Sequence, residues 1–243
     1  MDYMDDVLGY QQRILEEWRH FQNGEAVDAA VVRECVLRSW QRCRKKNVDP
    51  YGTRTKALSA HECRKVQAEN AFLMQSARMA MDQIWCMISG SHSTMVLASK
   101  QGVVLDMLPA DIPGSGVGCL SREEIIGTAG IATCLEERKQ IEIFGAEHFC
   151  ASRHDFVCAA APITSAKGEF VGVLGITSPF ETYHPHTSGM LKAGVYAISE
   201  QLGLRELLDE QNTLMEMLDE GVIVADAQQV IRSINRKAMD ILG

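Results

Sequence analysis

The spacing of apolar residues changes twice along this 243-residue chain, and those changes limit the folds open to it. Up to about residue 90, apolar side chains recur every three or four positions, the period of a helix. Between Thr94 and Thr177 they alternate or form short runs, the pattern of strands. From about Thr187 the helical period returns. The sequence therefore predicts a block of strands with long helices before and after it.

Three helices are predicted ahead of the strands. The first ends at Asn23-Gly24, and Val7, Gln11, Ile14, Trp18 and Phe21 fall on one helical stripe. The second ends at a break over residues 47–52 and has a stripe of Val32, Val36, Ser39 and Cys43, with Trp40 beside it. The third begins at Ser59, where Glu62 completes a capping box, and is expected to run for about 28 residues.

Five short strands are predicted next, over residues 94–99, 103–107, 139–144, 156–163 and 170–177. Residues 100–102 and 165–168 are turn signals, and a short helix over 128–137 separates the second strand from the third. Residues Ser121 to Glu124 form a second possible capping box. Short strands joined mostly by hairpins, with one helix among them, indicate an α+β sandwich.

The last long helix is predicted from about Thr187 to residue 218, roughly 32 residues or about 48 Å. Its length, and that of the helix over 59–90, favour a parallel dimer bundle over a simple cover for one sheet face. Residues 221–235 have a strand–turn–strand pattern, and residues 237–243 begin another helix. About 23 residues cannot bury a core of their own. We therefore expect the natural protein to be longer than this chain.

Charge and cysteine usage narrow the class of protein. A net charge of −8 argues against general nucleic-acid binding, and the basic run over 42–46 is predicted to be a solvated helix end. No stretch approaches the roughly 20 apolar residues of a membrane span, and the acidic N-terminus has the wrong sign for a signal peptide. The eight cysteines are scattered, with no CxxC pair, so we expect reduced thiols and a cytoplasmic location.

Several motifs resemble one bacterial family, and they occur in the order expected for it. They are Arg38-Ser-Trp-Gln-Arg-Cys43 with Asp49-Pro50, Glu123-Glu-Ile-Ile-Gly-Thr-Ala-Gly-Ile-Ala132, Gly145-Ala-Glu-His-Phe149 and Cys158-Ala-Ala-Ala-Pro-Ile163. The family is the GAF-containing regulatory region of sigma-54-dependent transcription activators of the acetoin and dihydroxyacetone catabolism type. The resemblance spans residues 30–243. Within it, residues 214–243 resemble the first two strands and helix start of a PAS domain.

The resemblance implies an arrangement of domains and a function. It implies an N-terminal helical region (1–83), a GAF ligand-sensing domain (84–186), a linker helix (187–218) and the truncated start of a PAS domain (219–243). In the family, the sensory part controls a central ATPase domain, and a C-terminal helix-turn-helix binds DNA. This chain has no Gly-x-x-x-x-Gly-Lys phosphate loop and no basic recognition helix. Contacts with ATP, DNA and sigma-54 RNA polymerase are thus expected only through domains outside it, and it is not expected to be an enzyme.

A ligand pocket is expected between one sheet face and a roof formed by residues 126–134 and 144–156. Such pockets are mostly apolar with a few fixed polar groups. An aromatic content of 6% disfavours haem or a large chromophore, so we expect a small polar metabolite as the effector and no cofactor. The family motif more often reads Gly-Thr-Asn where this chain has Ala129, so a relative's ligand is not carried over. The pocket residues we expect are Met95, Leu97, Ile126, Thr128, Cys134, Ile141, His148, Phe149, Phe156 and Cys158, with Asp106 as a further polar candidate.

Other interpretations of these residues stay open. His148, Cys150, His154 and Cys158 are residue types that close tetrahedral zinc sites, although the resemblance accounts for His148 and Cys158 without a metal. Cys158 with His148 could also form a nucleophile or a redox centre, as in methionine sulfoxide reductases built on this fold. The family includes regulators controlled by subunits of a metabolic kinase, so the trigger could instead be a protein. The glycine-rich loop over 113–118 is interpreted as a pocket lid or a plain loop.

Overall fold

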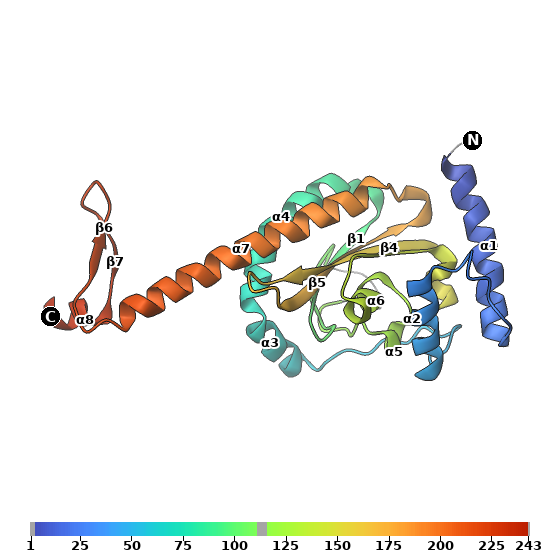
Figure 1. Cartoon of the computed structure of the whole chain (residues 1–243), viewed down its shortest axis with the longest axis horizontal. Helices are drawn as coiled ribbons and strands as arrows, with labels where there is room; N and C mark the ends of the chain where they lie inside the picture. The colour runs from blue at the N-terminus through green and yellow to red at the C-terminus, as the bar shows by residue number, and fades with distance from the viewer. Residues whose placement is uncertain (1–2, 111–115, 243) are drawn as a thin grey trace. The chain divides into compact units, whose positions relative to one another are not determined.

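The computed structural model describes residues 3–110 and 116–242, with side chains from residue 9 onward. The chain divides into two compact units, Met1–Ser199 and Glu200–Gly243. Residues 113–115 of the glycine-rich loop and the side chain of Val7 lie outside the described residues. Figure 1 shows the order of the elements along the chain.

Four helices precede the sheet: α1 (Tyr3–Asn23), α2 (Glu34–Lys45), α3 (Ala60–Glu69) and α4 (Ala71–Ile88), followed by the 3-10 turn η1 (Ser89–Ser91). The predicted capping box is confirmed, because the Glu62 backbone donates to Ser59 Oγ and the Ser59 backbone donates to the Glu62 carboxylate. The single long helix predicted from Ser59 is wrong, because it breaks at Asn70. The Asn70 side-chain amide donates to the Val66 carbonyl and so competes with the helical hydrogen bonds of that turn.

The first unit contains one antiparallel five-stranded sheet in the order β2-β1-β5-β4-β3. Its strands are β1 (Thr94–Ser99), β2 (Val104–Leu108), β3 (Ile141–Phe144), β4 (Phe156–Thr164) and β5 (Phe170–Pro179). Their bounds lie within two residues of the predicted ones. Between β2 and β3 lie the short helix α5 (Glu123–Ile126) and α6 (Gly130–Glu137), and the 3-10 turns η2 (Gly145–Glu147) and η3 (Ala151–Arg153) connect β3 to β4. The turn η4 (Phe180–Thr182) follows β5.

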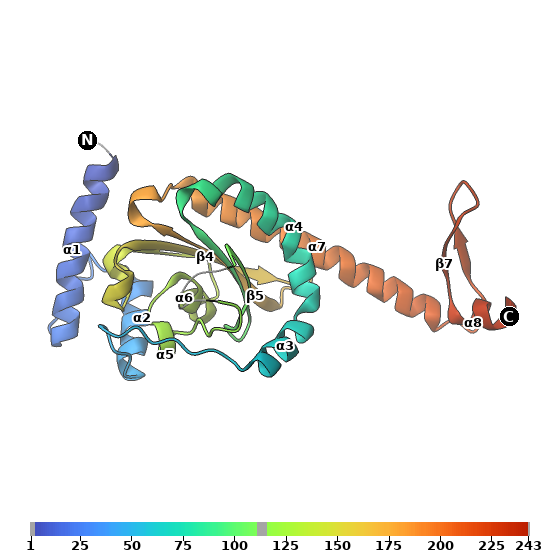
Figure 2. The ribbon, with the colours of Figure 1, turned by 180° about the vertical axis from the view of Figure 1, so that it is seen from behind.

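Helices cover both faces of this sheet. The long helix α7 (His186–Glu216) lies beside α4 on one face, and α6 lies on the other (Figures 1 and 2). Small residues let α6 come close to the strands, because a Cβ at Gly130 would lie 2.9 Å from Cys158 Cβ and one at Gly175 would lie 2.7 Å from Ile131 Cγ1. Both distances are too short for real atoms. The sequence pattern thus keeps α6 in direct contact with β4 and β5.

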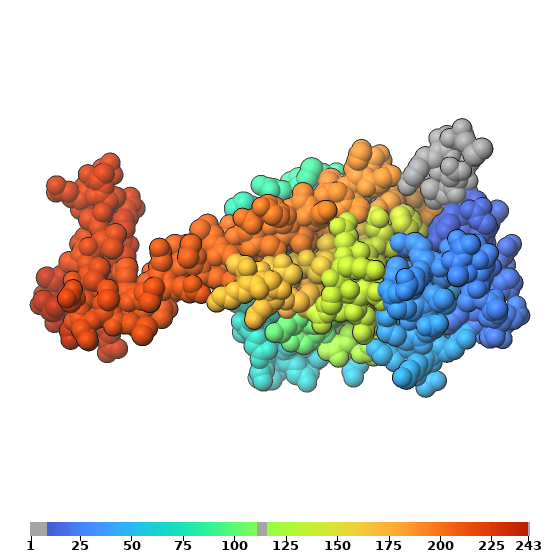
Figure 3. All heavy atoms as spheres, in the orientation of Figure 1, coloured from blue at the N-terminus to red at the C-terminus, as the bar shows by residue number. Residues whose placement is uncertain are grey.

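The N-terminal helices belong to the core of the first unit. Trp18, Phe21 and Trp40 lie in one apolar cluster with Ile143 and Phe149, which come from the far end of the sheet. The indole N–H of Trp18 donates to the Phe149 carbonyl, and that of Trp40 donates to the Glu147 carbonyl. Figure 3 shows the blue N-terminal segments packed against the yellow-green part of the chain. Without α1 and α2, this end of the sheet domain would expose its aromatic residues.

Two local predictions are wrong for one shared reason. The capping box at Ser121–Glu124 does not form, since α5 begins after Arg122 without a side-chain cap. The helix end over 42–46 is not simply solvated, because Arg42 pairs with Glu123 and Glu137 and Lys46 pairs with Glu124 and Glu136. The acidic residues of α5 and α6 face α2. Sequence spacing could not show that contact because about 80 residues separate the partners.

The second unit contains the rest of α7, the hairpin β6 (Ile223–Ala225) and β7 (Ile231–Ile234), and α8 (Arg236–Leu242). The predicted strand–turn–strand pattern and helix start are confirmed. Asn235 is fully buried, and its side chain accepts from the Val222 and Ala238 backbones and donates to two carbonyls. Among the described residues, no helix is both long and apolar enough to cross a membrane.

Candidate functional site

A cavity of about 220 Å³ lies on the α6 face of the sheet. Its floor is one row of the sheet, because Thr94 and Thr177 are cross-strand partners and Thr177 also pairs with Cys158. Thr94, Val96 and Thr177 are only partly buried although they lie in inner strands. The remaining walls come from the segment after α2, from the chain before α5, from the end of α5 and the start of α6, and from η3 and the start of β4. Their residues are Thr55, Lys56, Cys119, Leu120, Ser121, Ile126, Ala129, Gly130, Ile131, Arg153 and Phe156.

Three of the ten predicted pocket residues line this cavity: Ile126, Phe156 and Cys158. Met95 and Leu97 do not, and that part of the prediction is wrong. They pair with Ile176 and Leu174, on the face covered by α4 and α7, while their neighbours Thr94 and Val96 face the cavity. The prediction is shifted by one residue along the strand, and such a shift places a side chain on the opposite face of the sheet. Hydrophobicity could not distinguish the faces because helices cover both.

The other five predicted residues do not line the cavity. Cys134, Ile141 and Phe149 are part of the apolar cluster shared with α1 and α2. Thr128 and His148 are fully buried and bonded to neighbouring side chains or carbonyls. Asp106, the further polar candidate, pairs with Arg78. The hydroxyls of the cavity floor that the sequence analysis missed, Thr94 and Thr177, had one available signal: each is a polar residue near the end of an otherwise apolar strand.

A hydrogen-bonded chain leads from the core to the cavity floor. The His148 ring lies 2.9 Å from the Gly145 carbonyl through Nδ1 and 3.2 Å from Cys158 Sγ through Nε2. Cys158 Sγ lies 3.2 Å from Thr177 Oγ1. Burial lowers the pKa of His148 to about 4, so the imidazole is neutral near pH 7. Nδ1 therefore donates to Gly145, and Nε2 accepts from the Cys158 thiol.

The neutral His148–Cys158 pair is better suited to holding the cavity floor in position than to nucleophilic catalysis. An imidazole with a pKa of about 4 is a weak base toward a thiol, whose ordinary pKa lies near 8.5. The other members of the predicted zinc constellation have separate partners, since Cys150 Sγ lies 3.7 Å from the Asp49 carbonyl and His154 Nε2 lies 3.2 Å from the His148 carbonyl. Within the described part of the chain, no three His, Cys, Asp or Glu side chains are placed to hold a metal ion.

A buried polar cluster ties α2 to the cavity wall. The Glu123 carboxylate is fully buried and accepts from Arg42 Nε at 2.7 Å, from Arg42 Nη2 at 2.8 Å and from Ser39 Oγ at 2.5 Å. Ser39 Oγ lies 2.7 Å from Thr128 Oγ1. Residues 126 and 129–131, on either side of Thr128, line the cavity. The first two sequence motifs therefore meet in space, and they fix the segment that forms the cavity wall.

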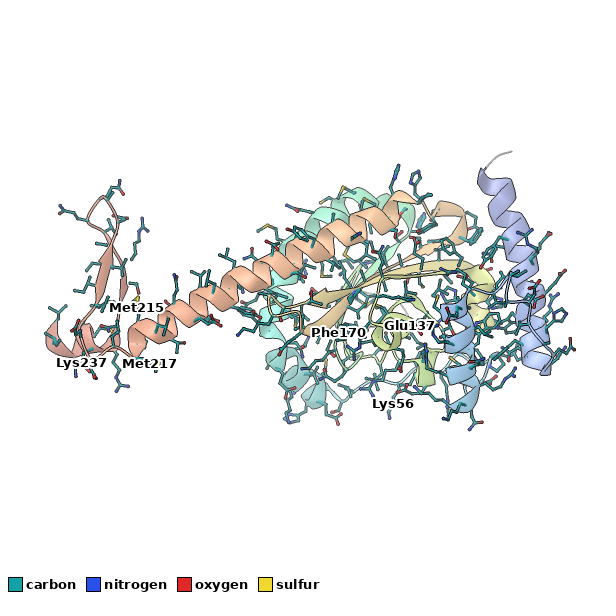
Figure 4. All side chains as sticks on the ribbon, viewed as in Figure 1. Lys56, Glu137, Phe170, Met215, Met217 and Lys237 are labelled. Atoms are coloured by element: carbon teal, nitrogen blue, oxygen red, sulfur yellow. The ribbon has the colours of Figure 1, made fainter. Side chains whose placement is uncertain are left out.

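Two further carboxylates extend this attachment. Glu137, labelled in Figure 4, accepts from Arg38 and Arg42, and the hydrogen bond from Arg38 is the largest cause that holds the pKa of Glu137 below its usual value. Glu147 is fully buried and pairs with Arg33, while Tyr10 Oη donates to it at 2.6 Å. Three acidic residues of the sheet domain thus hold the N-terminal helices and the segment between them.

The chain is similar in sequence to several bacterial operon regulators. The acetoin dehydrogenase operon transcriptional activator AcoR of Bacillus subtilis is 28% identical over 199 residues, which cover 79% of this chain and 33% of that protein. The propane 2-monooxygenase operon transcriptional activator MimR of Mycolicibacterium smegmatis is 27% identical, covering 80% of this chain and 34% of that protein. The PTS-dependent dihydroxyacetone kinase operon regulatory protein of Escherichia coli is 21% identical, covering 88% and 36%. The chain thus spans about a third of the length of these bacterial regulators.

The family follows from a match over most of the chain. Residues 11–193 match the MimR N-terminal domain family, and the chain belongs to that family. The sequence-based resemblance to regulatory regions of the acetoin and dihydroxyacetone type is confirmed. A solved structure, the E. coli DhaR(N)-DhaL complex, superimposes with a TM-score of 0.68 at 19% identity, covering 86% of this chain and 76% of that one. The predicted α+β, GAF-like fold is therefore confirmed.

The buried position of Glu123 predicts a large effect of its removal. Glu123→Ala leaves Arg42 and Ser39 without their buried partner, and we expect the free energy of unfolding to fall by about 3 kcal/mol in urea titrations. The matched control is Glu34→Ala, because Glu34 pairs with Arg38 while 87% of its side chain is exposed. That control should lose less than about 1 kcal/mol. Equal losses in the two variants would contradict a structural role for the buried cluster.

The neutral state of His148 predicts acid sensitivity. In the folded chain its pKa is about 4, against about 6.5 when unfolded, so the unfolded chain binds more protons between these pH values. The free energy of unfolding should consequently fall as the pH drops from 6.5 toward 4, by about 2 kcal/mol between pH 7 and pH 5 from this group.

The comparison that isolates His148 is with His148→Asn, which keeps a side-chain N–H near the Gly145 carbonyl but does not titrate. Urea titrations at pH 7 and pH 5 should show a smaller pH dependence in the variant. His154, whose burial also lowers its pKa to about 4, is present in both proteins and cancels. An unchanged pH dependence in His148→Asn would show that this imidazole is not neutral in the folded protein.

Proposed function

We propose that this chain is the signal-input region of a longer bacterial transcription activator and that its cavity binds a small catabolic metabolite. Membership of the MimR N-terminal domain family supports the regulatory part of this proposal, as do relatives that are operon activators. An ATPase domain, a DNA-binding domain and contact with sigma-54 RNA polymerase would belong to parts of the protein outside this chain. In this proposal the chain itself catalyses no reaction.

The cavity is the observation that supports the ligand-binding part of this proposal. It combines apolar walls, from Val96, Ile126 and Ile131, with two hydroxyls and a thiol on its floor. Ligand sites typically combine an apolar lining with a few fixed polar groups. The floor groups are held in place, because Thr177 and Cys158 are linked to each other and to buried His148. Such a floor can orient one face of a small polar molecule.

The signal would leave the cavity through its wall. Residues 126–131 touch the cavity on one side and the Glu123 cluster on the other, so a ligand that displaces this wall also acts on α2. Such a response requires different ligand affinities in two states of the protein. We keep the proposed domain limits of 1–83, 84–186, 187–218 and 219–243, with α1 and α2 completing the core of the GAF domain.

A homodimer through the long helices is part of the proposal. Leu204, Leu207 and Leu214 of α7 are about half exposed or more, and with Gln211 they repeat at spacings of three and four. That repeat is the seam of a coiled coil. Sedimentation velocity at micromolar concentration should give a dimer of the 26.9 kDa chain, and Leu207→Glu should shift it toward monomer. A wild-type chain that sediments as a monomer would contradict this part of the proposal.

A second candidate is control by a protein partner. A solved structure with the same fold is a complex of DhaR(N) with DhaL, which favours a docking role for a domain of this kind. Mixing this chain with DhaL and measuring co-elution tests that alternative. A redox centre has less support, because the Cys158 thiol is paired with a neutral imidazole of low pKa.

Calorimetric titration tests the metabolite proposal. The panel consists of ketols, diols, amines and short organic acids, and we expect at least one to bind with saturable heat. Val96→Phe projects a ring into the cavity and should weaken that binding at least tenfold, about 1.4 kcal/mol. Val230→Phe is the matched control, because Val230 is exposed in the second unit. Binding that survives Val96→Phe unchanged, or no binding by any compound, would contradict the proposal.

A further inference from the structure

Three cations gather at the mouth of the cavity. Lys56 and Arg153 line the 220 Å³ cavity, and Arg54 and Arg153 line an adjoining one of about 420 Å³, which shares Thr55, Ile126 and Phe156 with the first. Neither cavity is lined by an Asp or a Glu among the described residues. Figure 2 shows the segment that carries Arg54 and Lys56 running from α2 past α5 to α3, and Figure 4 labels Lys56 on it.

Arg153 differs from other half-buried cations of this acidic chain. The chain has 32 acidic and 24 basic residues, and the half-buried Arg38 and Arg42 pair with carboxylates. Within residues 3–110 and 116–242, the side chains of Arg54, Lys56 and Arg153 form no ion pair and no hydrogen bond; Arg54 and Lys56 are exposed, and Arg153 is half-buried. A half-buried guanidinium without an anion is poorly compensated. An anion from outside the chain would compensate it.

The backbone that carries Arg153 is well fixed. It ends the turn η3, where the Ala151 backbone donates to the Pro50 carbonyl and the Arg153 backbone donates to the Cys150 carbonyl. The next residue, His154, packs edge-on against the Trp18 ring, with a centroid distance of 4.9 Å. The Arg153 charge also reaches the interior, because it adds to burial in lowering the pKa of His148. The backbone therefore holds the start of the Arg153 side chain in place beside the cavity.

The polar floor and the volume of the cavity limit the size of such an anion and the other functional groups that it can have. Thr94 and Thr177 supply adjacent hydroxyls that can bond a carbonyl or hydroxyl oxygen. A cavity of about 150 Å³ holds a benzene ring, so 220 Å³ accommodates roughly ten non-hydrogen atoms. The walls of Val96, Ile126 and Phe156 suit a short hydrocarbon body, which favours a carboxylate over a strongly hydrated phosphate.

We infer that the cavity takes a compact organic anion, a short 2-hydroxy or 2-oxo carboxylate. Its carboxylate pairs with Arg153 at the mouth, and its second oxygen accepts from Thr94 on the floor. A 2-hydroxy group also donates to Thr177 Oγ1, because the Thr177 proton is donated to Cys158 Sγ. Arg54 and Lys56 add attraction for the negative charge without needing direct contact. This inference rests on the proposed function of the cavity and narrows the class of metabolite that it binds.

Calorimetry with acids and their neutral amides tests the charge requirement. The probes are lactate, pyruvate and 2-oxobutyrate, each beside its primary amide, titrated into the whole chain. We expect at least one acid to bind tenfold or more tighter than its amide, because a guanidinium–carboxylate pair is charge-assisted and bidentate. Arg153→Gln should weaken that acid at least tenfold and its amide less than threefold. Ethyl phosphate, which has no carboxylate, is a further probe, and tighter binding of it than of any carboxylate would overturn the carboxylate assignment.

Matched variants separate local from general charge effects. Arg13→Gln removes one cation from an exposed position of α1, away from both cavities, and should leave the acid affinity unchanged within twofold. Arg153→Lys keeps the charge without the bidentate geometry and should give an intermediate affinity. Thermal unfolding and near-ultraviolet circular dichroism of Arg153→Gln and Arg153→Lys establish that each variant is folded.

The outcomes distinguish this inference from the proposed function. If ketols or amides bind as tightly as the acids and Val96→Phe abolishes their binding, the cavity is a ligand site and the anion inference is overturned. If Arg13→Gln weakens the acid as much as Arg153→Gln does, the inference is also overturned. If no compound in either panel binds, both the inference and the proposed ligand function fail.

Discussion

The buried carboxylate of Glu123 is the interaction on which the rest of the first unit depends. A charge without water is tolerated only when it is paired and hydrogen-bonded, and Glu123 obtains both from α2 through Arg42 and Ser39. This requirement attaches the N-terminal helices to the sheet domain and fixes the segment before α6. Because that segment is also the cavity wall, the architecture of the helices and the shape of the cavity are set together.

The cavity exists because the two faces of the sheet are covered differently. On one face, α4 and α7 pack over Met95, Leu97, Leu174 and Ile176, which are fully or almost fully buried. On the other, glycine at 130 and 175 lets α6 approach β4 and β5 closely, and the row containing Thr94 and Thr177 remains open beside the start of α6. Polar floor groups and apolar walls are thus adjacent, and the neutral His148–Cys158 pair supports the floor from the core.

Much of this fold could be predicted from the sequence, because periodicity is a local property. The strands, the capping box at Ser59 and the end of α1 before Gly24 depend on residues within a few positions of one another. The candidate site was harder to predict from the sequence, because it depends on which face each strand residue lies on and on pairs of residues far apart in the chain. Met95 and Leu97 were assigned to the wrong face because both faces are apolar, and Arg42 was expected to be solvated because its partner Glu123 is 81 residues away. The position of the Arg153 charge beside the cavity could not be predicted, because the cavity forms where segments 52–56 and 150–156 meet in the fold.

We propose that the chain detects its signal in the cavity on the α6 face of the sheet. Methyl-labelled isoleucine NMR tests this most directly, because Ile126 and Ile131 line the cavity while Ile84 and Ile88 lie in α4, on the opposite face. Titration with the tightest-binding metabolite should shift the δ1 methyl signals of Ile126 and Ile131 saturably and leave those of Ile84 and Ile88 largely unchanged. Saturable binding that leaves Ile126 and Ile131 unshifted would contradict the account.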